Sequence, residues 1–174
     1  LKPNELYNVT ELNPQQGTLY QYLVEQVNVT FKYQFSITEQ SNINISYGFA
    51  TTLISPAGWN KTIYTPIGEN TFNFSGKFAS FNYEFVIEPA YYKALQKQIN
   101  EQIGGVASEY TLNIKPQITT IVSSSNYSLY ETFSPVLIFK TQSGSPATYL
   151  MDGFSHSSQE TIDHTETRYR VGIP

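Results

Sequence analysis

The chain has 174 residues, of which 40% are hydrophobic, and this suits one folded domain and excludes a disordered polypeptide. Ten basic residues against 14 acidic ones give a net charge of −4, so we expect no nucleic-acid partner, because nucleic-acid binders need a basic face. Cysteine is absent, which excludes disulfides and zinc-thiolate sites. No apolar run approaches 18 residues, so we expect no membrane span, and Leu1 reads as a processed N-terminus.

Residues 1–16 are predicted to form an N-terminal strand and hinge, followed by a head domain over residues 17–174. The first twelve residues read as an extended arm that carries apolar side chains at Leu1, Leu6, Tyr7, Val9 and Leu12. The next five residues, Asn13-Pro14-Gln15-Gln16-Gly17, combine turn-forming residue types and predict a hinge.

Period-two alternation then predicts a succession of β-strands. The clearest is Val27 to Ile37, where apolar and polar residues alternate strictly over eleven positions. The other candidate strands lie near residues 19–24, 43–53, 72–74, 81–87, 110–114, 118–122, 136–139, 147–151 and 169–173. One helix is predicted from Glu88-Pro89 to Gly104-Gly105, with Leu95, Ile99 and Ile103 packed on the sheet.

Eight or so short strands and a single helix predict an all-β fold, an antiparallel β-sandwich of immunoglobulin-like type. In this architecture the N-terminal arm has two possible positions. It can return to its own sheet as an edge strand, or insert into the sheet of the next subunit.

Glycosylation sequences of the form N-x-[ST] indicate an extracellular protein. Their number is about twice that given by chance from the asparagine, serine and threonine contents. Three of the asparagines, Asn28, Asn44 and Asn73, alternate with apolar residues of predicted strands and so are expected to point outward. We predict N-linked glycans at Asn8, Asn28, Asn44, Asn60, Asn73 and Asn126.

The sequence offers little support for catalysis or for a bound cofactor. His156, Glu160 and His164 have the spacing of metal ligands on a helix, but their segment is polar and reads as a solvated loop. Aspartate occurs only at Asp152 and Asp163, which disfavours calcium loops. We therefore predict no enzyme activity, no catalytic residue, no metal and no cofactor, although a glycosidase with an unrecognised pair of glutamates stays open.

The arm, the hinge and the glycosylation sequences together favour a subunit that polymerises by donating a strand to its neighbour. Tyr7 and Val9 would face the neighbour's core, and Asn8 would point outward with its glycan. Such a contact is head-to-tail and does not close on itself, so it builds a filament of identical subunits. A cell-surface ectodomain or adhesin that acts as a monomer is the alternative.

The N-terminus at Leu1, the six glycosylation sequences, the absence of cysteine and the all-β pattern resemble the subunit of the archaeal thread filament of thermoacidophilic crenarchaea. The resemblance implies a pilin-like fold and a glycosylated extracellular surface filament joined by donor-strand complementation. It also implies a donor strand containing Leu6, Tyr7, Val9 and Leu12. The middle of the chain, with Trp59 and the helix at Pro89, is also similar to uncharacterised archaeal ectodomains encoded near signal peptidases.

Overall fold

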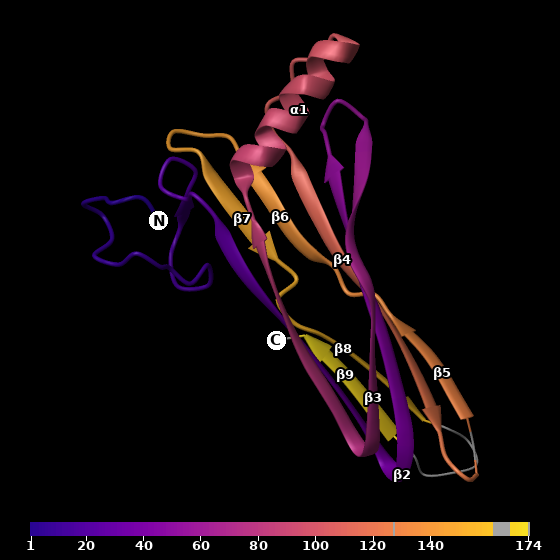
Figure 1. The fold of residues 1–174 in the computed structure, drawn as a ribbon. Helices are drawn as coiled ribbons and strands as arrows, with labels where there is room; N and C mark the ends of the chain where they lie inside the picture. Colours follow the sequence, from indigo (N-terminus) through magenta and orange to yellow (C-terminus); the bar gives the residue numbers. More distant parts are fainter. Residues whose placement is uncertain (127, 162–167, 174) are drawn as a thin grey trace.

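The computed structural model describes residues 1–126, 128–161 and 168–173. They form an antiparallel β-structure with one helix (Figure 1). The elements follow the chain as β1 (Leu19–Tyr20), β2 (Val27–Ile54), β3 (Asn60–Ile87), α1 (Pro89–Ile103), β4 (Thr111–Ser123), β5 (Ser128–Phe133), β6 (Leu137–Gln142), β7 (Thr148–Asp152), β8 (His156–Thr161) and β9 (Arg168–Ile173). The predicted all-β, sandwich-like fold with one helix is confirmed.

The strands β2 and β3 are each 28 residues long and form a hairpin that bends sharply partway along its length (Figure 1). At the bend, the register jumps from Ser36↔Phe78 to Ser41↔Gly76, so four residues of β2 stand opposite one of β3. Gly76 has φ 142, a backbone conformation that residues with a Cβ atom rarely adopt. Residues 27–37 and 43–53, which were predicted as two strands, therefore belong to one continuous strand that bends between them.

Each half of β2 pairs with a different neighbour on the edge away from β3. Residues 42–54 pair with β4, whose other edge pairs with β5 and β6, and β7 and β1 follow β6. Residues 34–36 pair with β9, which pairs with β8. The bent sheet therefore has two halves whose inner faces meet.

Aromatic side chains fill the space between the two halves. Phe31 contacts Phe49 with ring centroids 5.6 Å apart, and Phe81 stacks on Tyr47 at 4.4 Å. The Tyr33 hydroxyl and the Thr120 Oγ1 are 2.8 Å apart in a buried hydrogen bond between β2 and β4. The inner residues of β2 have odd numbers on both sides of the bend, as the alternation predicts.

Helix α1 begins with Pro89 at its first turn and ends at Gly104, which has φ 75. These limits match the prediction from Glu88-Pro89 and Gly104-Gly105. The packing prediction holds for Leu95, which lies against the core, but Ile103 is exposed. The helix is instead held by two buried polar side chains: Gln96 donates to the Glu109 carbonyl and Asn100 to the Ala107 carbonyl.

Two segments differ from their predictions. Only Leu19 and Tyr20 of the predicted strand 19–24 are extended, because the chain then turns, with Leu23 N–H and Val24 N–H both donating to the Tyr20 carbonyl. Residues 1–18, all of which are described, contain no strand, so the predicted extended N-terminal strand is a loop in this chain. Among the described residues, no helix is long and apolar enough to cross a membrane.

Candidate functional site

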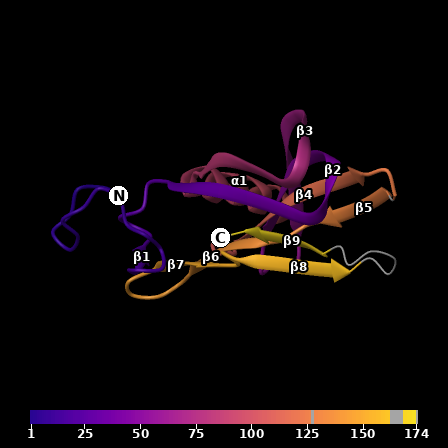
Figure 2. The same cartoon turned by 90° about the horizontal axis from the view of Figure 1, so that it is seen from below.

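The N-terminal segment, residues 1–18, lies at the end of the molecule beside β1 (Figure 2). It closes on itself through the Leu1 amino group, which donates to the Thr10 carbonyl at 2.8 Å. The Lys2 N–H donates to the Leu23 carbonyl at 2.8 Å, and the Tyr7 hydroxyl to the Thr18 carbonyl at 3.0 Å. Of these hydrogen bonds, only the one from Lys2 ties the segment to residues that follow it, and the other two lie within the segment.

The four predicted donor residues divide into two pairs. Leu6 and Val9 are 61% and 50% exposed. Tyr7 is half-buried, with its ring 6.5 Å from that of Tyr20, and Leu12 packs against the core. The segment therefore shields part of its apolar surface and leaves the rest in water.

The predicted hinge forms a tight turn. Gln16 N–H donates to the Asn13 carbonyl at 2.9 Å, and Gln15 N–H to the Asn13 side-chain oxygen at the same distance. Gly17 follows with the Leu12 side chain so near that an added Cβ would lie 3.0 Å from it. The turn sets the direction of the N-terminal segment, and its Pro14 reaches the cavity described next.

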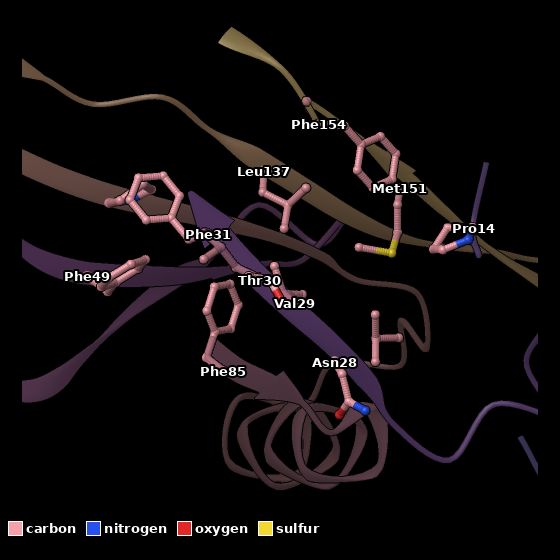
Figure 3. A pocket seen from close by; sticks show the side chains of 14 residues that line it. Pro14, Asn28, Val29, Thr30, Phe31, Phe49, Phe85, Leu137, Met151 and Phe154 are labelled. Atoms are coloured by element: carbon pink, nitrogen blue, oxygen red, sulfur yellow. The ribbon is translucent and has the colours of Figure 1, made fainter. Parts of the chain in front are cut away.

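An apolar cavity of about 150 Å³, hereafter the acceptor groove, opens between the first half of β2 and the strands β6 and β7 (Figure 3). Inner residues of β2 such as Val29 and Phe31 line one side. Leu137 of β6, Met151 of β7 and Phe154 line the other. Phe49 and Phe85 continue the lining into the aromatic core. The acceptor groove is thus an open part of the sandwich interior.

The groove runs along the first residues of β2. All five consecutive residues from Val27 to Phe31 line it, including Asn28 and Thr30, whose side chains are exposed. In the described residues, the only strand paired with residues 27–33 is β3, on the opposite edge. Strand β9 occupies the groove-side edge at residues 34–36 only. Among the residues that the structure describes, residues 27–33 thus have β3 as their only paired strand and lie beside an apolar groove.

All six predicted glycosylation asparagines lie at the surface. Asn8, Asn28, Asn60, Asn73 and Asn126 are exposed, and Asn44 is half-buried. The strand asparagines Asn28, Asn44 and Asn73 point outward, as the alternation predicts. Asn44 and Asn73 are direct partners across β2 and β3, which the sequence did not indicate.

The predicted loop around His156 is instead strand β8, which pairs with β9. On a strand, residues four apart such as His156 and Glu160 lie about 13 Å from each other along the backbone, so this segment does not have the helical geometry on which the metal-ligand spacing depended. His164 and Asp163 lie outside the described residues. No cluster of three metal-ligating side chains occurs in the part of the chain that the structure describes.

Shifted pKa values belong mainly to tyrosines of the core. Burial raises the pKa of Tyr33 and Tyr110 well above the ordinary value of 10.0. Burial also raises the pKa of Tyr92 and Tyr149. At the surface, hydrogen bonds from Ser143 lower the pKa of Glu109, whose carboxylate accepts from the Ser143 N–H at 2.8 Å. These groups lie in packing and loop contacts, and the acceptor groove is lined by uncharged residues.

The outward positions of the strand asparagines were predicted from the sequence and the acceptor groove was not, while the donor role of Leu6, Tyr7, Val9 and Leu12 stays a prediction. The alternation of Val27 to Ile37 gave the inner face of the strand. It carried no signal for which strand, if any, pairs with each edge. Comparison with protein family models, curated proteins and solved structures gives no match to this chain.

Proposed function

We propose that the protein is a structural subunit of an extracellular filament, polymerising head-to-tail by strand donation and coated with N-linked glycans. The observation that carries the proposal is the edge of residues 27–33 beside the acceptor groove, where the described residues place no strand other than β3. Proteins normally cover such an edge, since its free N–H and C=O groups pair readily with another chain. A strand added there would gain backbone hydrogen bonds and an apolar surface together.

The N-terminal segment has the length and the side chains for this role. Fully extended, residues 1–12 span about 40 Å, and the edge of residues 27–33 spans about 23 Å. Val9, exposed in the closed loop, would become buried in the groove of the next subunit, on the same strand face as Tyr7 and opposite to that of Leu6 and Asn8. Completing the burial of this half-exposed aliphatic side chain contributes about 1 kcal/mol.

Release of the segment breaks three hydrogen bonds, which together cost more than the burial of one side chain returns. The closed loop is tied by the bonds from Leu1, Lys2 and Tyr7, each worth about 0.5–1.5 kcal/mol net in water. A donated strand would replace them with a ladder of backbone bonds along residues 27–33. Dissociation would then open part of the sandwich, so the filament would be kinetically durable.

A single-residue test uses protein made without glycosylation, so that only the arm is changed. Val9→Asp places a charge in the apolar groove and is expected to abolish filaments seen by electron microscopy. Asn8→Asp is the matched control, because the neighbouring side chain points away from the groove on an extended strand. Filaments of normal length from Val9→Asp would overturn the proposal.

A monomeric glycosylated cell-surface ectodomain or adhesin is the second candidate. The self-closing bonds of the N-terminal segment favour it, since they occupy the arm within its own chain. The mass of the native particle separates the two candidates: a single subunit mass supports the ectodomain, and a long polymer supports the filament.

A further inference from the structure

Two of the predicted glycosylation asparagines, Asn44 and Asn73, form a directly opposed pair across β2 and β3. The Asn44 Nδ2 donates a hydrogen bond to the Asn73 Oδ1 at 2.7 Å. Each asparagine begins a full N-x-[ST] glycosylation sequence: Asn44-Ile45-Ser46 and Asn73-Phe74-Ser75. The two candidate attachment atoms are therefore side by side on the same outer face of the sheet.

Opposed residues of antiparallel strands have Cβ atoms only about 4.5–5.5 Å apart. Two glycans started from such a pair would compete for the same space from their first sugars onward. The other four asparagines are not paired in this way. Asn28 is opposite Val86 and Asn60 is opposite Ile54, while Asn8 and Asn126 lie outside strands.

The two members of the pair are not equivalent. Asn44 is half-buried and flanked on both sides, by Asn73 on β3 and by Ile121 on β4. Asn73 is exposed on β3, which pairs only with β2 among the described residues. The Asn44 nitrogen is held in the hydrogen bond, whereas the Asn73 nitrogen takes no part in it. Asn73 is the more accessible attachment atom.

We infer that Asn44 and Asn73 act as one composite glycosylation site, in which Asn73 carries the glycan and Asn44 stays unmodified as its hydrogen-bond donor. The inference rests on the proposed glycosylation of this chain. In the transfer, the bond from the sugar C1 of a glycosyl phosphate donor to its phosphate oxygen breaks and a bond from C1 to the Asn73 Nδ2 forms. The Nδ2 loses one proton, and the phosphate leaves with the bonding electrons. The Asn73 Oδ1 keeps its bond from Asn44.

The test is glycopeptide mapping of protein from a glycosylating host, with the occupancy of each asparagine measured. We expect Asn73 to be modified in most chains and Asn44 in few, with a summed occupancy that does not exceed one per chain. Two serine variants remove one attachment sequence each and keep both asparagine side chains. Ser75→Ala is expected to raise Asn44 from a small minority to the majority of chains, because its competitor is gone. Ser46→Ala, the matched control, is expected to leave Asn73 unchanged.

Contrary results separate the inference from the proposed function. Full occupancy of both Asn44 and Asn73, with glycans also at the other positions, overturns the composite site and leaves the glycoprotein proposal standing. An unmodified Asn44 in the Ser75→Ala variant also overturns it, because competition would not then be the cause. Bare asparagines at all six positions overturn both.

Discussion

The hydrogen bond between Tyr33 and Thr120 is a sensitive test of how the two halves of the sheet are joined. Both side chains are almost completely buried, and their oxygens are 2.8 Å apart. Tyr33→Phe leaves the Thr120 hydroxyl buried without its partner, which costs about 1–3 kcal/mol of unfolding free energy. For a chain of this size each kcal/mol corresponds to about 2–4 °C in Tm. Calorimetry and urea unfolding measure both quantities.

The second part of the experiment uses the double variant Tyr33→Phe with Thr120→Val. Removing both hydroxyls leaves no unpaired group, so the double variant is expected to be nearly as stable as the natural chain, and more stable than Tyr33→Phe. Thr119→Val is the control, since Thr119 faces the outer side and its change should stay within about 0.5 kcal/mol. A double variant that loses the full sum of the single changes would refute the proposed interior contact.

Two further predictions follow from the core and the helix. Burial raises the pKa of Tyr33 and Tyr110 above 10.0, so the contribution of the two neutral phenols to the free energy of unfolding is complete below pH 10 and falls as the pH rises further. Urea unfolding from pH 7 to pH 11 should show this loss. A free energy of unfolding that stays constant over this range contradicts the prediction. Gln96→Ala removes the donor to the Glu109 carbonyl and is expected to cost about 1–3 kcal/mol, against less than about 0.5 kcal/mol for the exposed Gln98→Ala. Equal urea midpoints for these two variants would mean that Gln96 does not anchor α1.

The local features of the fold could be read from the sequence because they depend on neighbouring residues. Strict alternation in Val27 to Ile37 marked the inner face of β2, and Pro89 and Gly104 marked the ends of α1. The same alternation placed Asn28, Asn44 and Asn73 on the outer surface. These predictions required no knowledge of which strands pair.

The features that the sequence missed depend on distant pairing. Strand β5 was not predicted. Its half-buried Leu129, Glu131 and Phe133 alternate with exposed residues, and this alternation in burial depends on the pairing of β5 with β4. Strand β8 is polar and looked like a loop, but it pairs with β9. The helix stripe was misjudged because Gln96 and Asn100 find buried carbonyl partners in the segment after α1.

At the candidate site too, features set by neighbouring residues could be predicted and features set by distant pairing could not. Leu6 and Val9 were predicted as donor residues because apolar side chains stand out in a polar arm. The acceptor groove was not found, because the pairing of a strand edge is a property of the whole sheet. The pairing of Asn44 with Asn73 follows from a register that spans 29 positions of the chain.

The most direct measurement of the central claim is an electron cryomicroscopy reconstruction of the native material. The filament account predicts that residues 6–12 of one subunit lie as a strand along residues 27–33 of the next, with Val9 in the acceptor groove. Single subunits whose Leu1 amino group still contacts the Thr10 carbonyl, with residues 27–33 unpaired in every particle, would contradict it.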